Sequence, residues 1–175
     1  NLREYIQHSF TAYYGNRVRN ISDYTGKPWE GFVIWRNHVL SFGLGVKYNT
    51  DLPVEYLGIV PTTEFYNKYY GEHRWKSLTI ISMAIGQGEL GTTPLQLATM
   101  TAAIDNGGLY YRPPLVKAID GQPITNRFTE KQIRTMLRQY FKSAIYGMEL
   151  VLQQVGPGNL PVIDSLAMLS KPGHR

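Results

Sequence analysis

Apolar positions near the start of the chain recur with a helical period. They predict a helix over residues 1–22, with an interruption near Ser9. A second helix is predicted to begin at Lys27-Pro28, because proline fits the first turn of a helix, and to end at Gly43. Its inner face is expected to consist of Phe32, Val33, Val39 and Leu40.

The pattern changes after this second helix. Residues 43–61 are rich in glycine and proline, which indicates a loop with short extended pieces. A short helix is predicted from Thr62 as its cap to Tyr70, with Gly71 ending it. Residues 78–85 form the apolar run LTIISMAI, which suits either a strand or a buried helix, because periodicity alone does not separate the two.

Thr93-Pro94-Leu95-Gln96 is the clearest helix start in the chain. The threonine hydroxyl can accept a backbone N–H while the Gln96 side chain reaches back to the cap, and Pro94 occupies a position where a missing N–H does no harm. This helix is predicted to end at residues 106–108, Asn-Gly-Gly. Beyond it the sequence predicts, in order, a turn over residues 110–114, a strand over 115–119, a mostly helical stretch over 129–152 and an extended end over 159–175.

Composition is that of a globular protein. Of the 175 residues, 43% are apolar and 18% are charged, so the chain suits one domain or a large part of one. It contains no cysteine, which excludes disulfides, thiolate zinc sites and cysteine nucleophiles. The four histidines show no metal-ligand spacing, so no metal site is expected.

The basic charge of the chain does not indicate a nucleic-acid-binding protein. The net charge is +5, but the lysines and arginines are scattered and form no block. Thirteen tyrosines could stack on bases, yet they lie at helical spacings among other apolar residues. We therefore interpret them as packing residues and expect no nucleic-acid partner.

The segment Gly86-Gln87-Gly88-Glu89-Leu90-Gly91 has the form G-x-G-x-x-G, which also occurs in dinucleotide-binding turns. In those turns the helix begins within the glycines, so that its first N–H groups meet the pyrophosphate. Here the cap at Thr93 places the helix start beyond the last glycine. The acidic residue that should follow is also misplaced, since Asp105 ends the helix and Asp120 lies too far on. Nucleotide binding is thus disfavoured.

Three segments carry a resemblance to a known family. Residues 84–116, AIGQGELGTTPLQLATMTAAIDNGGLYYRPPLV, closely resemble the I-G-Q-G…T-P-L-Q-[LM]-A…N-G-G stretch of penicillin-binding transpeptidases. Residues 42–61, FGLGVKYNTDLPVEYLGIVP, resemble that family's F-G-[LF]-G…D-L-P-x-E segment. Residues 5–20, YIQHSFTAYYGNRVRN, resemble its second catalytic motif, and the tail resembles the third. The agreement is best for the class B, elongation-type (penicillin-binding protein 2) branch.

The resemblance implies an α/β fold of the transpeptidase and serine β-lactamase-like type, in which helices flank an antiparallel sheet. Residues 1–175 would form a partial transpeptidase domain, supplying mostly the helical lobe and part of the sheet. In that family the glycine segment is a structural turn beside the active-site sheet and binds no phosphate. Glu89, within this turn, is expected to be exposed to solvent.

The family's chemistry starts with a serine in a Ser-x-x-Lys motif that attacks a D-Ala-D-Ala carbonyl and forms an acyl-enzyme. No Ser-x-x-Lys occurs in this chain, so the nucleophile is expected upstream of Asn1. Ser9-Phe10-Thr11 matches the position of the Ser-x-Asn motif. Ser9 would relay a proton, whereas Thr11, in a substrate-binding position, replaces an amide with a shorter hydroxyl.

The third motif of the family, Lys-Thr-Gly-Thr, matches Lys171-Pro172-Gly173-His174. By the resemblance, Lys171 holds the substrate carboxylate, Gly173 belongs to the substrate-binding strand, and the backbone N–H of His174 is an oxyanion donor. Pro172 departs from the motif, because it removes a hydroxyl and a backbone N–H.

Two functions remain open from the sequence. The chain is either part of a peptidoglycan D,D-transpeptidase or a degenerate relative that keeps the fold as a binding or scaffold module of the cell-wall machinery. Thr11 and Pro172 favour the second.

The resemblance implies stem peptides as substrate, β-lactams as ligands if the parent protein is active, and possible cell-wall elongation partners. It implies no cofactor. The family lies on the periplasmic side of the bacterial inner membrane, anchored through an N-terminal helix of the parent protein.

Overall fold

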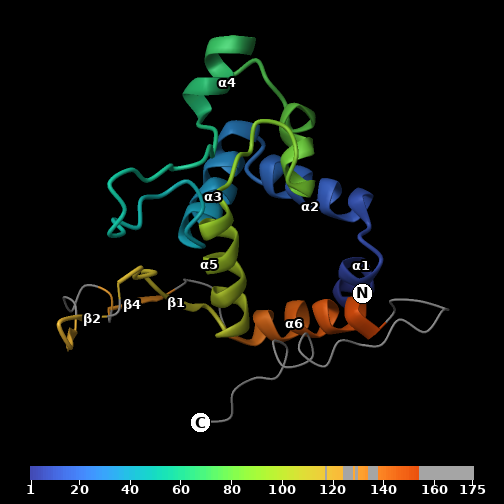
Figure 1. Cartoon of the computed structure of the whole chain (residues 1–175). Helices are drawn as coiled ribbons and strands as arrows, with labels where there is room; N and C mark the ends of the chain where they lie inside the picture. Colours follow the sequence, from blue (N-terminus) through green and yellow to red (C-terminus); the bar gives the residue numbers. More distant parts are fainter. Residues whose placement is uncertain (117, 124–127, 129, 134–137, 154–175) are drawn as a thin grey trace.

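The computed structural model describes residues 1–116, 118–123, 128, 130–133 and 138–153 (Figure 1). Its elements, in chain order, are α1 (Leu2–Gln7), α2 (Thr11–Asp23), α3 (Pro28–Ser41), α4 (Thr63–Tyr70), the 3₁₀ helix η1 (Ser77–Ile85), α5 (Pro94–Asp105), β1 (Leu109–Tyr111), β2 (Ala118–Ile119), β3 (Gln122–Pro123), β4 (Lys131–Ile133) and α6 (Arg138–Gln153). Helices dominate, as expected. In Figure 1, α5 links an upper group of helices to a lower layer in which α1 lies on α6.

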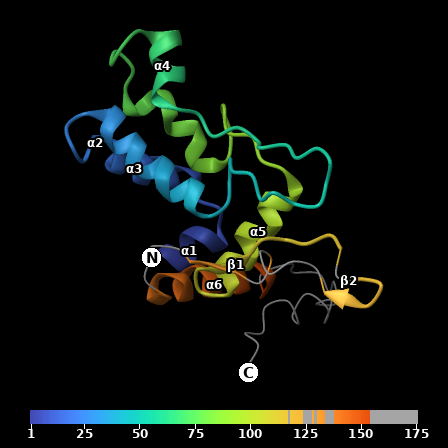
Figure 2. The same cartoon turned by 90° about the vertical axis from the view of Figure 1, so that its left-hand side faces the viewer.

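The larger hydrophobic core lies between α2, α3, α4 and η1, and Figure 2 shows α2 and α3 side by side. Its centre is the ring of Phe32, which is fully buried and meets Tyr66 and Trp75 edge-on at centroid distances of 5.5 and 5.6 Å. Edge-to-face pairs of this kind add to the stabilisation that burial of the rings provides. The buried members are Val18, Phe32, Tyr66, Trp75, Ile80 and Met83.

Small residues let α2 and α3 approach closely. A Cβ atom built on Gly31 would lie 2.3 Å from the carbonyl oxygen of Ile21 and 2.5 Å from the Cα of Ser22, so no larger residue fits there. Ser22 is fully buried at this crossing. Its Oγ has no hydrogen-bond partner among the residues that the structure describes.

The loop of residues 42–61 is braced by one carboxylate. Glu55 accepts hydrogen bonds from the backbone N–H of Tyr48 and, at 3.2 Å, from that of Thr50. The Tyr48 hydroxyl donates to the carbonyl of Gly43 at 2.8 Å. Tyr48 also belongs to a second, smaller core with Ala103 and Tyr110. The loop is therefore ordered by its own side chains and by contact with α5 and β1.

The start of α5 joins this loop to the rest of the molecule. Thr93 and Gln96 form the capping box expected from the sequence: Thr93 Oγ1 accepts from the N–H of Gln96 at 3.2 Å, and Gln96 Oε1 accepts from the N–H of Thr93 at 3.1 Å. The amide nitrogen of Gln96 also donates to the carbonyls of Leu57, at 2.8 Å, and Val46, at 3.3 Å. Gln96 is 1% exposed, so each of these bonds satisfies a polar group away from water.

Several element predictions are confirmed. The break near Ser9 separates α1 from α2, Thr62 caps α4 through the N–H of Phe65, and Gly71 ends that helix at φ 90°. The apolar run that could have been a strand or a helix is η1, whose last residues turn at Gly86 in the left-handed conformation.

Other predictions are wrong. Val33 was expected on the inner face of its helix, but it is 41% exposed. The face of α3 that packs on the larger core carries Trp29, Phe32 and Trp35 instead. Residues 109–111 form a strand where a turn was expected to begin. The stretch 129–152 was predicted to be mostly helical; α6 confirms this, but strand β4 lies near the start of the stretch. The strand predicted at 115–119 is reduced to Ala118–Ile119.

The strands form two short antiparallel pairs. β1 pairs with β4, with Leu109 opposite Ile133, and β2 pairs with β3. The end of the chain that was predicted to be extended, residues 159–175, lies outside the described residues. No helix in the described part of the chain is long and apolar enough to span a membrane.

Candidate functional site

The candidate site is the tight connection between α1 and α2. Ser9 lies in this connection with φ 49°, a left-handed value that is uncommon for a residue other than glycine. Two backbone hydrogen bonds close the turn: the N–H of Ser9 donates to the carbonyl of Ile6 at 3.1 Å, and that of Phe10 to the carbonyl of Tyr5 at 3.0 Å. Helix α2 then begins at Thr11 with no side-chain cap from Phe10.

Ser9 lies in the turn and Thr11 is the first residue of α2, and both are exposed. A serine hydroxyl can donate and accept a hydrogen bond at once, so Ser9 is chemically able to pass a proton between two partners. Its role as proton relay and the substrate-binding role of Thr11 stay predictions.

Helix α1 is short and has no buried residue of its own, so its position depends on α6. Gly147 leaves the room for Ile6: a Cβ atom built on it would lie 2.9 Å from the Cβ of Ile6. Gln7 Nε2 donates to the carbonyl of Leu150 at 3.5 Å, and the Arg3 guanidinium lies 4.6 Å from the ring centre of Tyr146. These contacts hold α1, the helix that leads into Ser9, against α6.

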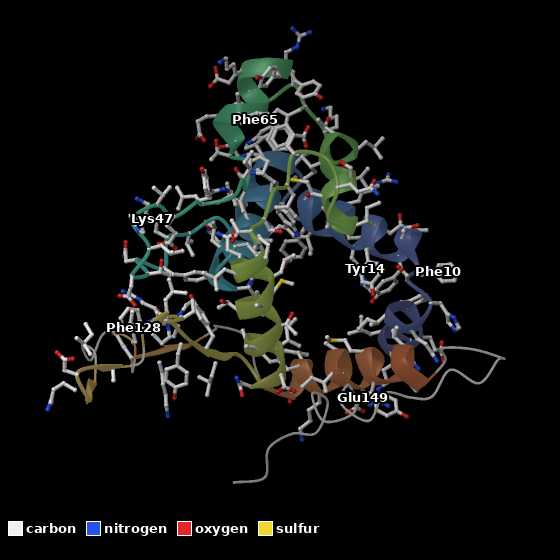
Figure 3. The ribbon with its side chains drawn as sticks, viewed as in Figure 1. Phe10, Tyr14, Lys47, Phe65, Phe128 and Glu149 are labelled. Atoms are coloured by element: carbon white, nitrogen blue, oxygen red, sulfur yellow. The ribbon has the colours of Figure 1, made fainter. Side chains whose placement is uncertain are left out.

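Aromatic rings lie on both sides of the turn. This feature was not predictable from the spacing of the tyrosines, which indicates packing residues and no more. Tyr5 and Tyr13 stack with centroids 3.9 Å apart and planes inclined by 14°. In Figure 3, Phe10 lies at the outer edge of the junction of α1 and α2, and Tyr14 lies nearer the centre of the molecule. Burial, and to a lesser extent the neighbouring Tyr13, raises the pKa of the Tyr14 hydroxyl above its ordinary value.

Lys171, Gly173 and His174 lie outside the described residues. Their approach to Ser9 therefore stays a prediction. Among the residues that the structure describes, no group of three or more histidine, aspartate or glutamate side chains is close enough to hold a metal ion.

The glycine segment precedes the helix and does not wrap its tip. Gly86 and Gly88 have φ values of 71° and 73°, and Gly91 forms a two-way backbone bridge with Ile59, with N···O distances of 2.6 and 2.9 Å. The helix starts only after Thr93, as predicted. The glycines thus form a turn that ties the start of α5 to the 42–61 loop.

Glu89, in the same turn, differs from its expected exposed state. It is half-buried and accepts a hydrogen bond from the hydroxyl of Tyr66 at 2.9 Å. Burial, this hydrogen bond and the negative charge of Glu89 raise the pKa of Tyr66. Glu89 therefore links the glycine turn to the larger core, and nothing in its local sequence signals that role.

Comparison with known proteins gives a consistent result. The family model for the penicillin binding protein transpeptidase domain matches residues 1–161. The peptidoglycan D,D-transpeptidase MrdA of Haemophilus influenzae is 36% identical over 133 residues, which cover 74% of this chain and 20% of that protein. The chain thus spans only about a fifth of that relative's length.

Solved structures show the same fold. Pseudomonas aeruginosa PBP2, in complex with WCK 5153, aligns with a TM-score of 0.73 and 28% identity, covering 89% of this chain and 33% of the other. PBP2 of Helicobacter pylori, in complex with MreC, aligns with a TM-score of 0.68 over 89% of this chain and 26% of the other; at 24% identity it supports the fold alone. The fold is therefore the serine β-lactamase-like one, as expected. The chain belongs to the penicillin-binding protein transpeptidase domain family and is of the PBP2 type.

Proposed function

We propose that this chain is part of a peptidoglycan D,D-transpeptidase that cross-links stem peptides through an acyl-serine intermediate. The observation that carries the proposal is the match of residues 1–161 to the transpeptidase family. It is supported by the resemblance of Ser9-Phe10-Thr11 to the family's second motif, in a segment where these residues are exposed. Residues 1–175 would be a partial domain, with the Ser-x-x-Lys nucleophile upstream of Asn1.

In this proposal the acylation step divides between the two parts of the protein. The upstream serine attacks the D-Ala-D-Ala carbonyl, its lysine and Ser9 move the proton from the hydroxyl to the leaving amine, and backbone N–H groups stabilise the oxyanion. Lys171 provides a positive charge for the terminal carboxylate of the substrate, and the N–H of His174 is one oxyanion donor. No cofactor takes part.

The resemblance to the family also implies where the activity takes place. The protein would act in the cell envelope, on the periplasmic side of the bacterial inner membrane, anchored through an N-terminal helix. A solved structure of a peptidoglycan synthase complex contains a chain that is 26% identical to this one, with a TM-score of 0.68, and supports a partner in the cell-wall machinery.

The alternative is an inactive scaffold of the cell-wall machinery. Thr11 lacks the paired donor and acceptor of the asparagine amide, and Pro172 lacks both a hydroxyl and a backbone N–H. These two departures from the family's motifs are the observations that favour it.

Labelling with a fluorescent penicillin separates the two functions. The full-length protein that contains this chain is expected to form a covalent adduct on a serine upstream of Asn1, and unlabelled ampicillin should compete for it. Ser9→Ala should slow acylation by about 100-fold or more, since proton transfer by a positioned group contributes about 10²–10⁴ to a rate. Ser41→Ala, whose hydroxyl only donates to the carbonyl of His38 at the end of α3, is the matched control and should react at the normal rate. Absence of any adduct on the folded protein would establish the scaffold instead.

A further inference from the structure

We propose that the stacked rings of Tyr5 and Tyr13 position Ser9 for proton transfer. The inference rests on the proposed function, because it assigns positioning residues to the same turn. Tyr5 lies in α1 and Tyr13 in the first turn of α2, so the stack joins the two helices across the turn that contains Ser9.

Ser9 needs such a restraint. A left-handed backbone is disfavoured for a residue with a Cβ atom, and it persists only where the surroundings hold it. The turn has no glycine or proline to fix its shape, and its side chains are exposed. The restraint must therefore come from the helices on either side.

Among the described residues, the Tyr5–Tyr13 stack is the closest ring contact across the turn. Its planes are nearly parallel and its centroids lie 3.9 Å apart, while Phe10 meets Tyr5 edge-on at 6.0 Å. The carbonyl of Tyr5 also accepts the N–H of Phe10, which closes the turn directly after Ser9. The Arg17 guanidinium lies 5.0 Å from the ring centre of Tyr13, one helical turn further along α2.

General core packing does not account for this arrangement. Neither Tyr5 nor Tyr13 belongs to either of the two hydrophobic cores, and α1 contributes no buried residue. The contact is between ring faces, so the aromatic ring and not the hydroxyl carries the effect. A phenylalanine should therefore replace Tyr13 in this role, whereas a leucine should not.

The kinetic test uses the full-length protein and separates binding from chemistry. Acylation by a fluorescent penicillin is followed over a range of concentrations to obtain the limiting rate and the half-saturating concentration. Tyr13→Leu should lower the limiting rate by about tenfold to 100-fold, as a misplaced catalytic group does, and leave half-saturation within about threefold. Tyr13→Phe should restore the rate to within about twofold. Tyr69→Leu is the control and should react normally: it removes an exposed tyrosine whose ring lies 4.8 Å from that of Phe65, in α4 and away from the turn.

A second readout does not depend on activity. Amide hydrogen exchange at Ser9 and Phe10 should become about tenfold faster in Tyr13→Leu, because the turn opens more often, and should stay unchanged in Tyr13→Phe. Unchanged exchange in Tyr13→Leu would overturn the proposal, as would a normal acylation rate or equal defects in the two variants. If the wild-type protein forms no adduct but exchange responds as expected, the proposed function fails while the positioning of Ser9 stands.

Discussion

The hydroxyl of Ser22 is buried where α2 crosses α3, and within the described part of the chain it has no hydrogen-bond partner. A buried polar group without a partner costs about 1–3 kcal/mol of desolvation. Alanine has nearly the same shape and a higher helix propensity, and it also fits beside Gly31.

We therefore expect Ser22→Ala to stabilise the protein by about 0.5–1 kcal/mol, measured as the free energy of unfolding in urea. Ser77→Ala is the matched control. The hydroxyl of Ser77 is also buried, but it donates to Asp23 Oδ2 at 3.2 Å, so its loss should destabilise by about 0.5–1.5 kcal/mol. Equal losses for both variants would contradict this interpretation of Ser22.

Single residues also mark the limit of what the sequence could predict about the site. The break at Ser9 was predictable because the helical pattern is interrupted there. The Tyr5–Tyr13 stack was not, because its geometry depends on the angle between two helices, which neither helix determines alone. The same holds for Tyr66 and Glu89, whose hydrogen bond joins residues 23 positions apart.

At the scale of elements, Gln96 connects the start of α5 to the 42–61 loop. Gln96→Leu keeps the approximate volume but leaves the carbonyls of Leu57 and Val46 and the N–H of Thr93 without this partner. We expect a loss of about 2–4 kcal/mol in the free energy of unfolding, since each buried group left unpaired costs about 1–3 kcal/mol.

Gln87→Leu is the control for this element. Gln87 is an exposed glutamine in the glycine turn, so its replacement should change the free energy of unfolding by less than about 0.5 kcal/mol. A Gln96→Leu protein as stable as Gln87→Leu would show that the loop is held by other contacts.

Helix boundaries were predictable where capping chemistry is local. Thr62 and Thr93 each bond to a backbone N–H three residues on, so the signal lies within one turn of chain. The short strands were not predictable: β1 and β4 each have three residues, and each residue pairs with a partner 20 to 24 positions away. A 3₁₀ helix such as η1 is also hard to predict, because its apolar residues follow no α-helical or strand period.

At the scale of the whole molecule, the packing of α1 on α6 joins segments about 140 positions apart, as Figure 1 shows at the base of the molecule. Gly147→Val would place a side chain within 2.9 Å of the Cβ of Ile6. We expect it to destabilise the protein by about 1–3 kcal/mol and to displace α1, since overpacking forces neighbouring atoms apart.

Urea denaturation measures the first effect, and faster proteolytic cleavage within residues 1–10 reports the second. Lys142→Val, at an exposed position of α6, introduces the same β-branched side chain into the helix without the clash. It should cost only the lower helix propensity of valine, less than about 1 kcal/mol. Similar losses for both variants would mean that α1 does not depend on Gly147.

The 3₁₀ geometry of η1 determines how far its nine residues extend. Nine residues in a 3₁₀ helix rise by about 18 Å, whereas the same residues in an α-helix would rise by only about 13.5 Å. The element therefore sets the distance between Trp75, before its start, and the glycine turn, after its end, while its own Ile80 and Met83 pack in the larger core. An α-helix would need about three more residues to cover the same distance, because it rises less per residue. The 3₁₀ form thus lets a shorter segment connect these two points.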